Sequence, residues 1–104
     1  MSAWKIGEIP VLKRGVYLRE TPGAYLLLFP EGYMELDEIA WQILQRCDGH
    51  HDMEAIVRAM MDRYAGDPDT IRNDVQEFLM EMRRHGLLEF RTPSDPGRFA
   101  SNAG

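Results

Sequence analysis

The sequence predicts an α+β domain with a winged-helix-like arrangement, in which a three-stranded antiparallel sheet is followed by three helices. Short stretches with strand-like alternation, separated by turn residues, occupy the first third of the chain, up to Leu36. Three stretches with apolar residues at helical spacing follow, and an acidic residue stands near the start of each. Strands grouped before helices, with no internal repeat, are typical of the α+β class.

The three strands are expected around two turns. Val16-Tyr17-Leu18 precedes the turn Thr21-Pro22-Gly23, and the apolar run Tyr25–Phe29 follows it. Pro30-Glu31-Gly32 ends that run, because the proline has no amide hydrogen to donate and the glycine can adopt a positive φ. Tyr33–Leu36 then alternates and is expected to fold back on the second strand. The outer backbone edge of this last strand is predicted to be free.

Acidic caps and apolar stripes define the three predicted helices. The carboxylate of Asp37 or Asp52 can accept hydrogen bonds from the free amides of the helix that follows it. Gly86 suits the end of the third helix, after three residues whose charges complement the helix dipole. Leu87 and Leu88 are expected to form a brief extended segment. The expected starts are Asp37, Asp52 and either Pro68 or Asp69, and the expected ends are Cys47, Tyr64 and Gly86.

The ends of the chain differ in composition from its centre. Residues 1–10 show no clear periodicity and are predicted to be a flexible arm. The segment from residue 91 to 104 is rich in Pro, Gly, Ser and Asn, which is typical of a disordered tail. One folded domain is therefore expected over residues 11–90.

The composition is that of a soluble globular chain. Of the 104 residues, 44% are hydrophobic and 28% are charged, and the formal net charge is −5. No apolar run approaches the roughly 20 residues that cross a bilayer, and the first ten residues lack the apolar region of a signal peptide. The single cysteine excludes an internal disulfide and fits a reducing cytoplasm. We expect a cytoplasmic monomer without membrane contacts; exchange of the N-terminal hairpin between two copies is the alternative.

No sequence motif for catalysis or cofactor binding is present. The glycines are dispersed at turns, and the acidic residues fall at helix caps or on exposed helix faces. Cys47, His50 and His51 form C-x-x-H-H, but a second paired motif is missing, so a polar turn is favoured over a zinc site. Cys47 itself lies on an apolar stripe and is predicted to be a core residue. We therefore expect a binding module without catalytic residues, metal or cofactor, and not an enzyme.

Nucleic-acid binding is the rival that a winged-helix-like order suggests. In that case the third helix would enter the major groove. Acidic residues outnumber arginines in this region, so phosphate would repel the helix and we expect no nucleic-acid partner. The acidic residues are Asp67, Asp69, Asp74, Glu77 and Glu81, and the arginines are Arg72, Arg83 and Arg84.

Six short motifs together resemble the PqqD family, the peptide chaperones of pyrroloquinoline quinone (PQQ) biosynthesis. Their order and spacing cover about Pro10 to Leu88, and one departure is Asp37, where many relatives carry Asn. Both residue types cap helices, so the departure leaves the fold expectation unchanged. The motifs are LLLFPEG at Leu26–Gly32, ELDEIAWQIL at Glu35–Leu44, CDG at Cys47–Gly49, EAIV at Glu54–Val57, DV-x-x-FL at Asp74–Leu79 and GLL at Gly86–Leu88.

The resemblance implies a RiPP recognition element, a small domain that binds the leader part of a ribosomally made precursor peptide. The implied partners are a PqqA-like precursor peptide and a PqqE-like radical S-adenosylmethionine (SAM) enzyme, which joins a glutamate and a tyrosine of the peptide. The chaperone itself performs no chemistry in this family. A recognition domain that serves a different peptide-modification pathway is the alternative.

The predicted peptide site combines the free strand edge with the third helix. A peptide can add to the edge, and its alternate side chains can enter a groove beside that helix. Met34 would line the groove, whereas Met53 and Met60 are expected in the core. Leu36, Val75 and Phe78 are equally well explained as core residues. The predicted site consists of Tyr33, Met34, Glu35 and Leu36 on the strand and Ile71, Val75, Phe78 and Met82 on the helix, with Arg72 and Arg83 to meet acidic peptide residues.

Overall fold

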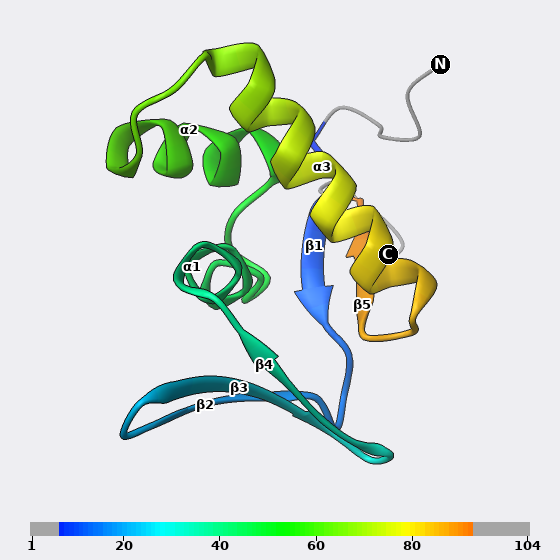
Figure 1. Ribbon diagram of the computed structural model, residues 1–104. Helices are drawn as coiled ribbons and strands as arrows, with labels where there is room; N and C mark the ends of the chain where they lie inside the picture. Colours follow the sequence, from blue (N-terminus) through cyan, green and yellow to red (C-terminus); the bar gives the residue numbers. More distant parts are fainter. Residues whose placement is uncertain (1–6, 93–104) are drawn as a thin grey trace, which may run out of the picture.

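A computed structural model of the chain describes residues 7–92, which form five strands and three helices. The expected order of three strands followed by three helices is confirmed, and a further pair of strands joins the two ends of the domain (Figure 1). The elements are β1 (Ile9–Leu12), β2 (Tyr17–Thr21), β3 (Ala24–Phe29), β4 (Gly32–Leu36), α1 (Glu38–Gln45), α2 (Met53–Arg63), α3 (Pro68–Arg84) and β5 (Leu88–Arg91).

Strands β2, β3 and β4 form an antiparallel sheet in the order β2-β3-β4. Two-residue turns join the strands, and Gly23 has a φ of 86° in the first turn, a value that glycine adopts without strain. Leu27 pairs with Leu18 on one side and with Met34 on the other. The central strand is thus flanked by two outer strands, and β4 is one of them, as the alternation of Tyr33–Leu36 predicted.

Acidic side chains cap all three helices. Oδ1 of Asp37 accepts a hydrogen bond from the Ala40 amide at 2.8 Å, and Oδ1 of Asp52 accepts one from the Ala55 amide at 2.9 Å. The third helix begins at Pro68, one of the two expected starts, and its N-cap is Asp67. Proline suits the first helical position because its missing amide hydrogen would have no partner there.

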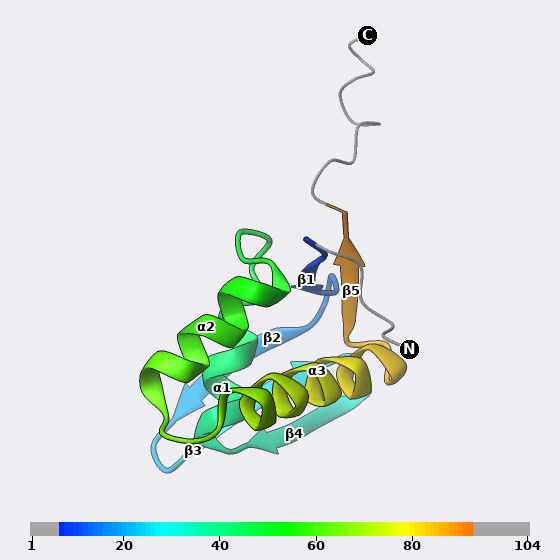
Figure 2. The same ribbon diagram turned by 90° about the horizontal axis from the view of Figure 1, so that it is seen from above.

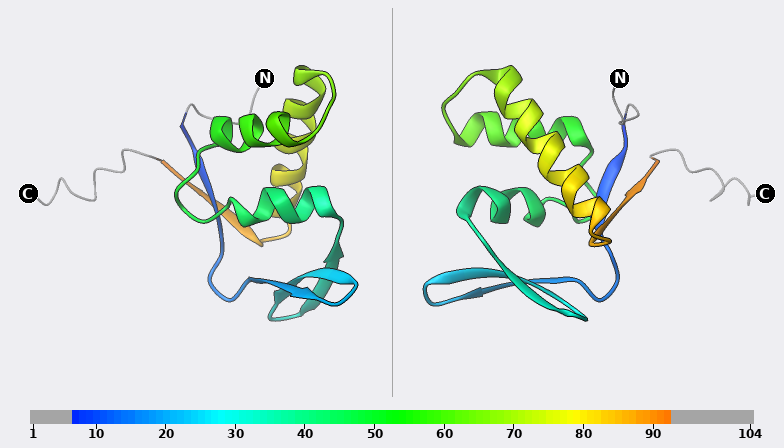
Figure 3. Two further views of the ribbon diagram at one scale, coloured as in Figure 1. Left: turned by 90° about the vertical axis from the view of Figure 1, so that its left-hand side faces the viewer. Right: turned by 45° about the vertical axis from the view of Figure 1, so that its right-hand side comes forward.

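All three helices lie on one side of the three-stranded sheet, and no helix formed by residues 7–92 covers the opposite face (Figures 1 and 3). The core lies between these layers and includes Leu27, Ile56 and Leu79, all with no exposed surface. Tyr25 on β3 stacks against Trp41 on α1, with ring centroids 4.6 Å apart. This stacking fixes α1 over the sheet.

Strands β1 and β5 pair with each other and were not predicted as a ribbon. Ile9 and Pro10, which we expected in the flexible arm, belong to β1, and the side chain of Pro10 is fully buried. Arg91, expected in the tail, pairs with Ile9. The amide of Leu12 also donates to the carbonyl of Cys47 at 3.2 Å. This pairing escaped prediction because it joins residues about 80 positions apart, which local alternation does not reveal.

The rest of the expected arm and tail, residues 1–6 and 93–104, lies outside the described residues. Among residues 7–92, no helix combines the length and the apolar character needed to cross a bilayer.

Candidate functional site

The outer edge of β4 carries unpaired backbone groups. Phe29 and Gly32 flank a two-residue turn and so form a hydrogen-bonded pair, from which bonded and non-bonded pairs alternate along β3 and β4. Met34 therefore directs its amide and carbonyl towards β3. Tyr33 and Glu35 direct theirs to the outside, where no strand of residues 7–92 pairs with β4. Two residues of β4 thus offer donors and acceptors to an added strand.

A cavity of about 500 Å³ lies beside this edge. Its walls come from β4 and the N-terminal half of α3, which run beside each other when the molecule is seen from above (Figure 2). The first turn of α1 and the end of α2 complete it. Its size is within the usual range of ligand sites, and its lining is mainly apolar. The cavity is called the β4–α3 groove below.

Six of the ten residues predicted for the site line the β4–α3 groove. Val75 has only 2% of its surface exposed, so it forms part of the floor and also belongs to the core. Met34, Ile71 and Phe78 are half-buried, pack against the core and remain in part accessible. The apolar stripe of α3 therefore contributes both to the core and to the lining of the groove. The six residues are Met34, Glu35, Leu36, Ile71, Val75 and Phe78.

The other four predicted residues do not line the groove. Tyr33 is 67% exposed and lies on the same face of the sheet as Glu35, away from Met34. Met82 is buried in the core, as are Met53 and Met60.

The two arginines predicted to meet acidic peptide residues are engaged elsewhere. Arg72 forms an ion pair with Glu54 on α2, and this hydrogen bond raises the pKa of the arginine. The guanidinium of Arg83 lies 4.8 Å from the centre of the Phe90 ring on β5. Both arginines therefore point away from the β4–α3 groove. The sequence pattern of α3 alone did not indicate these partners.

Several groove residues were missed. Ile39 at the start of α1 lines the groove and is 49% exposed. Its position beside the apolar stripe of that helix could have indicated an exposed apolar residue at the site. Tyr64 follows α2 and also lines the groove. Its hydroxyl oxygen is buried and has no hydrogen-bond partner within the described part of the chain. An unsatisfied buried hydroxyl is uncommon in native proteins, and this one belongs to a residue of the groove lining.

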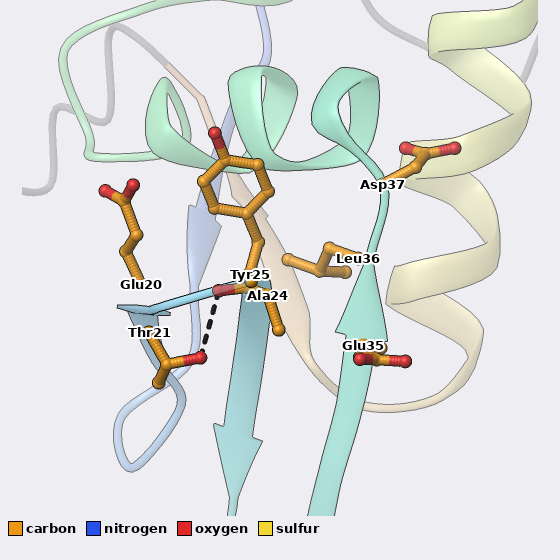
Figure 4. Close-up of a pocket in the computed structure, with 8 residues that line it drawn as sticks. Glu20, Thr21, Ala24, Tyr25, Glu35, Leu36 and Asp37 are labelled. Carbon is orange, nitrogen blue, oxygen red and sulfur yellow. Dashed lines mark hydrogen bonds between the residues drawn. The ribbon is translucent and has the colours of Figure 1, made fainter.

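A second cavity, of about 560 Å³, lies at the end of the three-stranded sheet. It shares Glu35, Leu36 and Asp37 with the β4–α3 groove. Figure 4 shows Glu20 and Tyr25 rising from β2 and β3 towards α1, and the Thr21 hydroxyl donating a hydrogen bond to the Ala24 carbonyl. The two hollows therefore lie on either side of the last residues of β4.

Cys47 and His51 of the C-x-x-H-H segment have separate surroundings in the structure. Cys47 is 2% exposed, which confirms the core assignment, and burial together with the neighbouring Asp48 raises the pKa of its thiol to about 12. Nδ1 of His51 lies 3.0 Å from Oδ1 of Asp48 instead of facing the thiol. No group of three or more potential metal ligands occurs in residues 7–92.

Comparisons with known proteins identify the family. The model of the family "Coenzyme PQQ synthesis protein D (PqqD)" matches residues 24–88. The chain is 36% identical over 91 residues to a protein named PqqA binding protein from Azotobacter vinelandii, with coverage of 86% of this chain and 98% of that protein.

Solved structures support the same assignment. The PqqD part of Methylobacterium extorquens PqqCD, described as a stand-alone RiPP recognition element, has a TM-score of 0.66 and 32% identity, and the match covers 77% of this chain and 87% of that one. TbiB1 in complex with the TbiA(beta) leader peptide has a TM-score of 0.68 and 26% identity, and the match covers 76% and 94% of the two chains. The fold, the matched segment and the identity over nearly the whole relative agree, and the chain belongs to the PqqD family.

Proposed function

We propose that this chain binds the PqqA precursor peptide of PQQ biosynthesis by adding it as a fourth strand along β4. The observation that carries the proposal is the open edge of β4 beside the mainly apolar β4–α3 groove. Main-chain hydrogen bonds to Tyr33 and Glu35 would provide affinity, and side chains entering the groove would provide specificity. The chain is then a binding protein and not an enzyme.

The names of similar proteins support this ligand. The Azotobacter vinelandii relative is named a PqqA binding protein, and the Methylobacterium extorquens domain is described as a functional RiPP recognition element. TbiB1, which shares the fold, was solved with a leader peptide bound. The groove does not favour nucleic acid, because the residues among 7–92 that line it include four acidic residues and neither arginine nor lysine.

The dimensions of β4 limit the peptide segment that the site can hold. Five residues of strand extend about 17 Å, so about five or six peptide residues can pair with them. Because side chains alternate between the faces of a strand, about three of them would point into the groove. We expect these to be large and apolar, since the floor is made of Leu36, Val75 and Phe78.

An NMR titration tests the proposal directly. The ¹⁵N-labelled chain is titrated with synthetic PqqA of Azotobacter vinelandii, and shifts are expected in residues 32–36 and 70–78. A peptide of the same composition with its apolar residues gathered at one end serves as the control, because it cannot place alternate side chains in the groove. Shifts confined to α2 and the β1–β5 ribbon would contradict the proposed site.

We further propose that the peptide-loaded chain presents PqqA to a radical SAM enzyme of the PqqE type. The family assignment supports this step. Size-exclusion chromatography of chain, peptide and enzyme should give a complex of all three, and the chain should accelerate joining of the peptide's glutamate and tyrosine. If the chain instead binds a leader peptide of another modification pathway more tightly than PqqA, the alternative recognition role is correct.

A further inference from the structure

The β4–α3 groove is apolar at its floor and acidic at its rim. Four carboxylates line it, Glu35 and Asp37 from the β4 side and Asp67 and Asp74 from the α3 side. The second cavity adds Glu20 to Glu35 and Asp37. Within the part of the chain that the structure describes, neither cavity is lined by arginine, lysine or histidine.

These carboxylates differ in how far their charge is already compensated. Asp37 and Asp67 cap helices, where backbone amides and the helix dipole offset part of the negative charge. Glu35 and Asp74 are exposed and form no ion pair with any residue of 7–92. Asp74 lies on the α3 wall of the groove, whereas the side chain of Glu35 points to the sheet face opposite Met34. The charge available to an added strand is therefore mainly that of Asp74 at its groove-facing positions and that of Glu35 at its intervening positions.

Nearby basic residues do not cancel this charge. Arg72 pairs with Glu54, and Arg83 lies over Phe90. Arg19 sits on β2, with β3 between it and Glu35. We expected arginines of α3 to meet acidic peptide residues, but the charged residues of the groove are acidic. They would attract basic peptide residues instead.

We propose that the groove selects an extended peptide segment whose apolar residues are accompanied by lysine or arginine, and that Asp74 sets this preference at groove-facing positions and Glu35 at the intervening positions. The inference rests on the proposed function, since it requires a peptide along β4. The apolar cavity and the strand edge make the site, and the carboxylates determine which peptides enter it. Opposite charges at the rim of an interface accelerate association and exclude partners of the wrong sign.

Three fluorescein-labelled decapeptides test the charge preference. They share leucine and phenylalanine residues, and three positions carry lysine, glutamine or glutamate: one groove-facing position on the Asp74 side and two intervening positions on the Glu35 side. At low salt, each charge pair at an exposed rim should change Kd by roughly fivefold. We expect the lysine peptide to bind most tightly and the glutamate peptide most weakly, and the difference should shrink in 0.5 M NaCl.

Charge reversal in the protein identifies the residues responsible. Asp74→Lys should weaken binding of the lysine peptide and strengthen binding of the glutamate peptide. Glu77→Lys is the matched control, because Glu77 is an exposed residue of the same helix that does not line the groove. It changes the net charge equally and should shift both affinities by less than about twofold, the effect of long-range charge alone. Circular dichroism checks that each variant keeps its helices.

The outcomes separate the inference from the function on which it rests. Equal Kd values for all three peptides, with the NMR shifts at residues 32–36 and 70–78 retained, would overturn the charge preference and leave peptide binding intact. Equal effects of Asp74→Lys and Glu77→Lys would overturn the assignment to the groove. Absence of binding by the decapeptides and by PqqA would overturn both proposals.

Discussion

The two outer strands of the three-stranded sheet, β2 and β4, have similar backbones and different surroundings. Each pairs with β3 on one side only, and each directs two residues outward: Leu18 and Glu20 on β2, Tyr33 and Glu35 on β4. Along β4, however, the N-terminal half of α3 stands at a distance that leaves the mainly apolar groove. Leu18 of β2 packs against the core instead.

The difference shows that an unpaired strand edge is not sufficient to define a peptide site. Backbone hydrogen bonds can form at either edge, but beside β4 the side chains of an added strand also meet the mainly apolar β4–α3 groove. The second cavity, which includes Glu20, Thr21 and Gly23, offers less apolar surface than the β4–α3 groove. We therefore infer that affinity at the β4 edge depends on backbone and side-chain contacts together.

The same substitution in each outer strand should separate the two edges most clearly. Glu35→Pro and Glu20→Pro each remove an outward amide that β3 does not use, so the sheet should survive both changes. Glu35→Pro should leave a peptide carbonyl without a donor and weaken PqqA binding about ten- to a hundredfold, equivalent to roughly 1–3 kcal/mol. Fluorescence anisotropy measures both affinities.

Glu20→Pro is the control for this prediction, and it should change the Kd by less than about twofold, because β2 takes no part in the proposed site. Proline at Met34 would be a poor test, since the Met34 amide bonds to β3 and its loss would disrupt the hairpin. Equal loss of binding in both Glu→Pro variants would show that the edges are not distinct.

Truncation of the two side chains that flank Leu27 sharpens the comparison. Leu18 and Met34 lie on either side of Leu27 in register, and both are half-buried. Leu18→Ala and Met34→Ala should each lower the free energy of unfolding by about 1–2 kcal/mol, as measured in urea. Only Met34→Ala should weaken peptide binding, by about fivefold, because only Met34 lines the groove. A similar loss in Leu18→Ala would indicate an indirect effect through Leu27.

The sequence predicted β4 and its neighbours well because their signals are local. Alternation in Tyr33–Leu36, the Asp37 cap and the apolar stripe of α3 are each readable from a few adjacent residues. The β1–β5 ribbon was missed because it joins the two ends of the domain. The arginines were placed by charge alone, and their partners Glu54 and Phe90 come from other elements. Tertiary partners of long side chains are not encoded in the helical period of their own helix.

Tyr64 provides a smaller test on the groove side. Its buried hydroxyl has no partner within residues 7–92, so Tyr64→Phe removes no hydrogen bond that the structure shows. The free energy of unfolding without peptide should stay the same or rise by less than about 1 kcal/mol. Urea denaturation measures this change. A loss above that value would show that the hydroxyl forms a hydrogen bond in solution.

The smallest effect is expected on the rate at which the Cys47 thiol is labelled. This rate checks whether the Glu20→Pro and Glu35→Pro variants keep an intact core. Burial and Asp48 raise the pKa of this thiol to about 12, so at pH 8 only roughly one thiol in ten thousand is ionised and labelling by a disulfide reagent should be slow. Because the Cys47 carbonyl also accepts the hydrogen bond from Leu12, rapid labelling requires the core between α1 and β1 to open. Glu20→Pro and Glu35→Pro should label within about twofold of the parent chain, and denaturant should accelerate all three. If Glu35→Pro alone labels fast, its loss of peptide binding reflects a disturbed core and not the absent amide of β4.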